Sequence, residues 1–213
     1  MSHRETLDAL LEQQGTTYAD EAGIRMRDTP QPLYQLLVLS DLLSARIRAS
    51  VAVAAARALY AHGMRTPRRM ADATWQQRVD ALGEGGYRRY DERTATQLGD
   101  GAVLLLTAHG GDLRRLRRDA DGDTGALRTM LQRFPGVGPT GADIFLREVQ
   151  TVWPETAPYL DAKALQGAQR LGLPTSPAGL TRLAKGRDSA VLAAALVRTA
   201  LDEGVAASVR AVA

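Results

Sequence analysis

Apolar positions along this chain recur at the three- and four-residue spacing of helix faces. The first such segment, residues 4–13, places Leu7, Leu10 and Leu11 on one face, and Gly15 follows it. The same pattern predicts further helices over residues 30–43, 47–62, 74–82, 88–108, 113–118, 127–134, 140–153, 161–173, 176–185 and 189–202. We find no convincing alternating strand and no internal repeat. The pattern therefore predicts an all-α fold.

The composition excludes several kinds of chemistry. The chain has 213 residues and no cysteine, which removes disulfides, thiol catalysis, zinc–thiolate sites and cysteine-bound iron–sulfur clusters. Its three histidines are scattered, so we expect no metal centre. No apolar run approaches the roughly 20 residues that span a bilayer, and the first residues lack a hydrophobic signal region. We expect a cytoplasmic protein without a membrane segment.

Arginine supplies nearly all of the positive charge, because lysine occurs only at Lys163 and Lys185. The net charge is +3 and the pI is about 9.5, which permits nucleic-acid binding without requiring it. Arginines gather in three groups: Arg65, Arg68 and Arg69; Arg88, Arg89 and Arg93; and Arg114, Arg115, Arg117 and Arg118. Acidic residues lie between them, so a solvated helix face remains the alternative for each group.

A glycine-containing turn stands between two predicted helices. Its sequence is Phe134-Pro-Gly-Val-Gly138, and Pro139 follows at the first position of the next helix. Gly136 and Gly138 would allow a tight turn with exposed backbone N–H groups, at which the positive end of the following helix points. Val137 is expected to anchor the turn between the helices. Such a turn binds phosphate without reading sequence, although a plain helix–helix connection is the alternative.

The turn and the segments after it resemble the helix-hairpin-helix DNA glycosylase superfamily, the endonuclease III-like enzymes. That family shows Leu-Pro-Gly-Val-Gly, an apolar helix containing Ala, a Val-Asp-Thr-His-like segment and an Arg-Leu-Gly ending. The corresponding parts here are Phe134-Pro-Gly-Val-Gly138, Ala142, Leu160-Asp-Ala-Lys163 and Arg170-Leu-Gly172. Two earlier stretches also match: Leu42-Leu-Ser-Ala45, and Gly86-Tyr87 with the residues from Tyr90 to Ala95. The resemblance covers residues 30 to 173 approximately, in matching order.

The resemblance implies two helical lobes. Residues 30–150 would form a helical barrel that ends in the hairpin. Residues 1–29 and 151–213 would form the second lobe, completed by a helix over 190–201. The implied partner is double-stranded DNA, bound in the cleft between the lobes near Asp161. The same resemblance suggests a monovalent cation held by carbonyl groups of the hairpin, and we expect a monomer.

Departures from the family pattern bear on the reaction. Bifunctional members have a lysine two residues after the last glycine of the hairpin, which attacks the sugar and then nicks the strand. Thr140 stands at that place and cannot form a Schiff base, so it joins Gly136, Val137 and Gly138 only as an expected DNA contact. The segment before Asp161 is also a few residues longer than usual, and the four-cysteine cluster of many members is missing. The resemblance therefore implies a monofunctional glycosylase, or a member that has lost activity.

Asp161 corresponds to the family's invariant acid. Breaking a glycosidic bond builds positive charge on the sugar, and a nearby carboxylate stabilises that charge or activates a water molecule. Asp161 also stands at the start of a predicted helix, where an aspartate cap contributes about 1 kcal/mol. Both roles can hold together.

Four further residues are candidates for the site. Lys163 could contact a phosphate or be solvated; residues two apart on a helix do not face each other, so we expect no ion pair with Asp161. Trp153 and Tyr159 could stack on an extruded base, although Trp153 could instead brace the segment before Asp161. Arg46 follows the Leu-Leu-Ser-Ala stretch and could fill the gap left by a flipped nucleotide.

The leading hypothesis is a monofunctional base-excision glycosylase that flips out a damaged base and cuts its N-glycosidic bond with Asp161. Alkylated purines are the expected substrate class, because their glycosidic bonds are already weakened. The alternative is a non-catalytic helix-hairpin-helix DNA-binding protein, and lyase activity through Lys163 is a third hypothesis. No G-x-x-x-x-G-K-[ST] loop indicates nucleotide hydrolysis.

Overall fold

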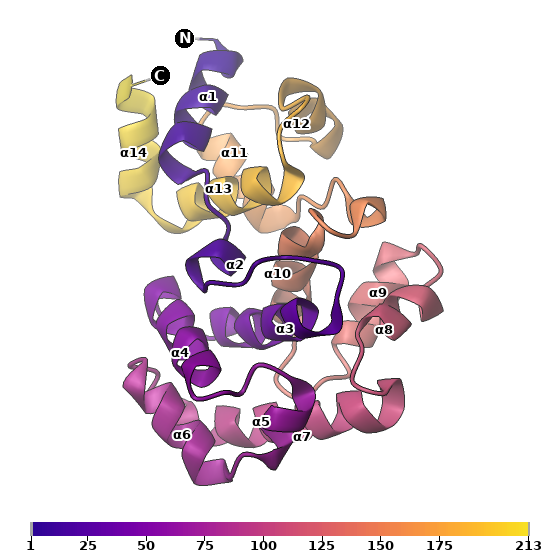
Figure 1. Cartoon of the computed structure of the whole chain (residues 1–213). Coiled ribbons are helices and arrows are strands. Elements are labelled where there is room, and N and C mark those ends of the chain that lie inside the picture. Colours follow the sequence, from indigo (N-terminus) through magenta and orange to yellow (C-terminus); the bar gives the residue numbers. More distant parts are fainter. Residues whose placement is uncertain (1, 213) are drawn as a thin grey trace. The chain divides into compact units, whose positions relative to one another are not determined.

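The structure is a computed structural model that describes residues 2–212, in which every regular element is a helix (Figure 1). This confirms the predicted all-α fold. The chain divides into two compact units. We call Ala19–Phe145 the central unit, and Met1–Tyr18 together with Leu146–Ala213 the terminal unit. None of the helices in the described part of the chain combines the length and apolarity needed to cross a membrane.

The central unit is built on α3, whose residues from Leu33 to Leu42 are all buried. Its helices are α3 (Pro30–Ser44), α4 (Ala49–Ala61), α5 (Pro67–Asp72), α6 (Trp75–Glu84), α7 (Asp91–His109), α8 (Arg114–Asp119) and α9 (Thr124–Leu131). Two further helices cross the division between the units, α2 (Tyr18–Glu21) and α10 (Pro139–Val149). Helix α3 packs on α4, α4 on α6, and α7 on both α5 and α6.

A buried arginine ties three helices of the central unit together. Arg78 of α6 is 9% exposed and donates to the carbonyl oxygens of Met70 (3.0 Å), Ala73 (2.7 Å) and Ala95 (2.7 Å). A Cβ on Gly99 of α7 would lie only 2.7 Å from this guanidinium. The absence of a side chain at that position is what admits the arginine between the helices.

The terminal unit is built on α13 (Ser189–Leu201), against which α1, α11 and α14 pack. Its other elements are α1 (His3–Gln14), the 3₁₀ helix η1 (Pro154–Thr156), α11 (Ala162–Arg170), α12 (Pro177–Leu183) and α14 (Glu203–Val212). Helix α11 approaches α13 so closely that a Cβ on Gly167 would lie 1.8 Å from the carbonyl oxygen of Leu196. The shared core includes Leu7, Leu10, Leu160, Ala164 and Leu196.

Candidate functional site

The predicted turn joins α9 to α10 in the central unit. Gly136 has a φ of +89°, a conformation that glycine adopts readily. The N–H of Val137 donates to the carbonyl of Phe134 (3.0 Å), and that of Gly138 donates to the carbonyl of Gly136 (3.1 Å). The turn itself therefore uses these two N–H groups. Val137 is 5% exposed and is buried as expected of an anchor.

The donors suited to a phosphate lie one step further along, in the first turn of α10. The first hydrogen bond into this helix runs from the N–H of Ala142 to the carbonyl of Gly138 (3.0 Å). Helix geometry leaves the preceding N–H groups, those of Thr140 and Gly141, without a carbonyl of their own helix. Thr140 is exposed, and the positive end of the helix dipole coincides with these donors.

An ion pair fixes the two helices that flank the hairpin. Arg128 of α9 donates from Nε to Asp143 Oδ1 at 2.6 Å and from Nη2 to Asp143 Oδ2 at 3.2 Å. Two parallel bonds of this kind set orientation as well as distance. The hairpin also rests on the C-terminal half of α3, where a Cβ on Gly141 would lie 3.6 Å from the carbonyl oxygen of Ser40. The turn between α9 and α10 therefore has a rigid support.

A buried acid lies directly against the hairpin. Asp41 of α3 is 8% exposed, and a Cβ on Gly136 would meet its Oδ1 at 2.6 Å. Within the described residues, neither Asp41 Oδ2 nor the hydroxyl of Tyr34 has a hydrogen-bond partner. Burial raises the pKa of Asp41 to about 7, against a smaller lowering by the charge of Arg93. The hairpin thus packs on a carboxyl group that stays protonated at pH values well above those at which aspartate side chains usually lose their proton.

In the terminal unit, Asp161 is held by two contacts. Its Oδ1 accepts the N–H of Ala164 at 3.1 Å, so the predicted cap at the start of α11 is confirmed. Its Oδ2 accepts Nη1 of Arg147 at 2.6 Å. The two side chains are 13% and 8% exposed, respectively. A carboxylate offers about four acceptor positions, so two remain for a water molecule or a ligand.

A second polar side chain fixes the segment that leads into Asp161. Gln150 is 3% exposed; its amide accepts the N–H of Tyr159 at 2.6 Å and donates to the carbonyl oxygens of Tyr159 (3.1 Å) and Arg147 (2.9 Å). Sequence reasoning missed both Arg147 and Gln150. Their position in the sequence could have indicated this role. Both lie among the apolar residues of the segment from Ile144 to Gln150, where a buried polar side chain needs a hydrogen-bond partner.

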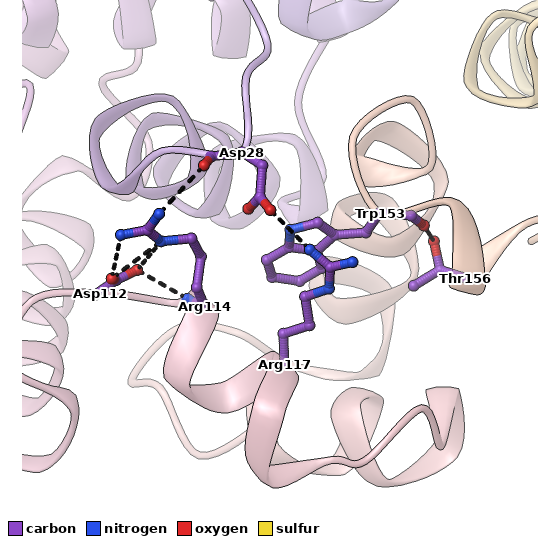
Figure 2. Close-up of polar contacts among 6 residues, drawn as sticks. All are labelled: Asp28, Asp112, Arg114, Arg117, Trp153 and Thr156. Atoms are coloured by element: carbon purple, nitrogen blue, oxygen red, sulfur yellow. Dashed lines mark hydrogen bonds and ion pairs between the residues drawn. The ribbon is translucent and has the colours of Figure 1, made fainter.

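The remaining candidates differ in exposure. Trp153 is 0% exposed and its carbonyl accepts the hydroxyl of Thr156 at 2.7 Å, which favours the bracing role over stacking on a base (Figure 2). Tyr159 is half-buried. Lys163 is exposed and donates to Gln166 at 2.8 Å. Arg46 is exposed just beyond the end of α3.

Two members of the third arginine group are engaged with acids. Arg114 forms a two-pronged pair with Asp112, with bonds of 2.8 to 3.1 Å, and also reaches the carbonyl of Asp28 at 3.4 Å (Figure 2). Arg117 donates to Asp28 Oδ2 at 2.8 Å. These pairs dilute the positive charge that a nucleic acid would meet on α8.

The candidate residues therefore divide between the units. Gly136, Val137, Gly138, Thr140 and Arg46 belong to the central unit, and Trp153, Tyr159, Asp161 and Lys163 belong to the terminal unit. Among residues 2–212, no group of three or more histidine, aspartate or glutamate side chains converges in a way that could hold a metal ion.

Comparison with solved structures identifies the type of fold. The chain is similar to endonuclease III in a trapped covalent intermediate with DNA, an estranged-adenine complex, with a TM-score of 0.52 and 17% sequence identity. It is also similar to endonuclease III in a non-covalent complex with DNA, with a TM-score of 0.54 and 17% identity. Each match covers 92% of this chain and 85% of the other. The fold is therefore endonuclease III-like.

Comparisons of the sequence gave no match. No protein-family model matches the chain. No curated protein matches it either.

Proposed function

We propose that this protein is a monofunctional DNA glycosylase, which binds duplex DNA through its hairpin and releases a damaged base with the help of Asp161. The observation that carries the proposal is the placement of Asp161 in an endonuclease III-like fold. Its carboxylate is fixed at the first turn of α11 by Ala164 and Arg147, yet it keeps acceptor positions free. A fixed carboxylate of this kind is suited to stabilise positive charge that develops on a sugar.

The proposed reaction has one bond broken and one formed. The bond between the sugar C1′ and the base nitrogen breaks, and its electron pair leaves with the base. Asp161 stabilises the resulting oxocarbenium character and orients a water molecule, whose oxygen then bonds to C1′. The proton of that water passes to the leaving base or to solvent. The products are a free base and an abasic site.

Strand cleavage by an amine is not part of the proposal. Thr140 occupies the position at which a lysine would be needed for a Schiff base, and its hydroxyl cannot form one. Alkylated purines are the proposed substrate class, because a base that already carries positive charge is a good leaving group and demands least from Asp161. The monovalent cation at the hairpin carbonyls stays a prediction, as does a monomeric state.

A non-catalytic DNA-binding protein is the second candidate, and one observation favours it. The two contacts of Asp161 are also those of a purely structural residue that caps α11 and neutralises the buried Arg147. On that reading the hairpin would bind phosphates, and the acid would only stabilise the terminal unit. Lyase activity through Lys163 has less support, because its amine is exposed and bonded to Gln166.

The deciding experiment measures base release from alkylated duplex DNA by the full chain and by its Asp161→Asn variant. Asparagine keeps the helix cap but removes the negative charge. We expect release by the native protein and a loss of at least about a hundredfold in the variant. The matched control is Asp188→Asn, which alters the cap of α13 in the same unit, where Asp188 accepts the N–H groups of Ala190 and Val191.

Two outcomes separate the candidates. Release that is lost in Asp161→Asn and retained in Asp188→Asn supports the glycosylase. Equal release by all three proteins would remove Asp161 from the reaction. If no protein releases a base from alkylated, uracil-containing, oxidised or mismatched duplexes while DNA binding remains salt-sensitive, the non-catalytic candidate is correct.

A further inference from the structure

A second basic site lies in the central unit, apart from the hairpin. A pocket of about 590 Å³ is lined by the loop after α2, the first turns of α3 and the C-terminal part of α4. Four arginines line it: Arg25, Arg27, Arg57 and Arg65. They come from three separate segments of the chain, so their convergence is a property of the fold and not of one basic stretch.

The charge in this pocket is not balanced by protein groups. No aspartate or glutamate lines it, and none of the four arginines forms an ion pair with any residue from 2 to 212. Arg65 donates from Nε to the carbonyl of Tyr60 at 2.8 Å, which orients its guanidinium without neutralising it. The contrast is with Arg114 and Arg117 of the same unit, which are paired with acids. Four unpaired like charges around one hollow favour the binding of an anion.

Uncharged polar groups in the pocket also have donors and acceptors free for a ligand. Gln35 is only 7% exposed, lines the pocket, and its side-chain amide is not hydrogen-bonded to any described residue. Thr29 precedes the first turn of α3, and its hydroxyl makes no capping bond. The Gln35 amide is therefore available to hydrogen-bond a ligand or solvent in the pocket. The positive end of the 15-residue helix α3 adds to the attraction for negative charge.

The pocket is separate from the phosphate-binding turn. Gln31 and Gln35 of the pocket stand near the start of α3, whereas the hairpin rests on Asp41 and Ser40 near its end. The rise of an α-helix places Gln31 and Asp41 about 15 Å apart along the helix axis, and the helix turns Gln35 and Asp41 toward different faces. One phosphate cannot contact both places.

We propose that this pocket binds a ligand carrying two or more linked phosphate groups. Guanidinium groups bind phosphate oxygens through paired N–H donors, and four of them can serve two or three phosphates at once. The volume is in the range of small-molecule sites and admits pyrophosphate or the phosphates of a nucleotide. The phosphates could belong to a free polyphosphate or to a nucleic-acid backbone. This proposal does not rest on glycosylase activity.

Calorimetric titration of the full chain with pyrophosphate, without divalent metal, tests the site. We expect saturable binding at one site, weakened at least about tenfold in Arg57→Gln, because one charged pair of donors is removed. Arg182→Gln is the matched control: Arg182 is exposed on α12 in the terminal unit, and the substitution changes net charge equally. Absence of saturable binding at millimolar pyrophosphate, or equal weakening by both substitutions, would overturn the proposal.

A second measurement identifies the source of the phosphates. Fluorescence anisotropy gives the affinity of each protein for a duplex at fixed salt. If the pocket binds a nucleic-acid backbone, Arg57→Gln weakens duplex binding beyond Arg182→Gln, and pyrophosphate competes with the duplex. If it binds a free polyphosphate, duplex affinity is the same in both variants and pyrophosphate does not compete. If the calorimetric titration shows that pyrophosphate binding depends on Arg57, either of these results supports the phosphate site and identifies the source of its phosphates.

Discussion

Arg147 donates from Nη1 to Oδ2 of Asp161 at 2.6 Å, and these side chains are 8% and 13% exposed. An ion pair this buried is expensive to break from one side, because the remaining charge is left without a partner. We expect Asp161→Asn to lower the free energy of unfolding by about 3 kcal/mol, measured by urea denaturation. The double variant Arg147→Gln/Asp161→Asn should recover part of this loss. An equal or larger loss in the double variant would contradict the pairing.

A pH dependence of stability follows from Asp41. Burial raises its pKa from 3.8 to about 7, so the folded protein holds a proton that the unfolded chain releases between those values. The contribution of Asp41 is therefore most favourable below pH 4 and is lost as the pH rises through 7. The expected total loss is on the order of 4 kcal/mol. Asp41→Asn should flatten this part of the urea-denaturation profile, whereas parallel profiles for the two proteins would refute the assignment.

The hairpin should tolerate no side chain at Gly136. An alanine there must adopt a φ of +89° and also displace the buried carboxylate of Asp41, which lies 2.6 Å from the position of the new Cβ. Gly172 is the control, since its φ is +67° but its Cβ would meet nothing within 4 Å. We expect Gly172→Ala to cost about 1–2 kcal/mol and Gly136→Ala clearly more, with weaker duplex binding in the latter alone. Equal costs would show that the contact with Asp41 is unimportant.

A lysine introduced at Thr140 tests the proposed function, because it would add the ability to form a Schiff base with an abasic sugar. Thr140 is exposed in the first turn of α10, two residues after Gly138. We expect Thr140→Lys to form a covalent adduct with an abasic duplex that borohydride traps, because a lysine amine condenses with the aldehyde of an abasic sugar. Thr181→Lys, an exposed substitution on α12, measures the background. Trapping no greater than that background would place the hairpin away from the sugar.

Helices whose ends carry their own signals could be predicted closely. The segment expected over 4–13 is α1 (His3–Gln14), with a capping box formed by Ser2 and Glu5. The segment expected over 47–62 is α4 (Ala49–Ala61), whose C-terminal end is marked by Gly63, although Arg48 provides no cap at its start. Helix α14 (Glu203–Val212) was not predicted, because Asp202 and Gly204 are residue types that commonly follow the end of a helix, here α13. It is stabilised by burying Ala206 and Val209 on the terminal core, which is a tertiary effect that local pattern does not contain.

The contacts of the candidate site could be predicted where they are local in the sequence. The cap made by Asp161 could be read from its place before an apolar helix, and its bond to Ala164 follows from helix geometry alone. The pairing with Arg147 spans 14 residues and two elements, so only the folded chain brings it about. Asp41 was missed for a related reason, since an aspartate in a helix is ordinarily expected at the surface.

The close approach of α11 to α13 has a mechanical consequence. With the backbone at Gly167 directly against the carbonyl oxygen of Leu196, α11 cannot turn about its axis or slide along α13 without a collision. Asp161 caps the same short helix six residues before this contact, so its backbone is held with that helix. A carboxylate mounted in this way does not swing toward a ligand. A ligand must therefore approach the carboxylate, because the backbone that carries Asp161 is held in place within the terminal unit.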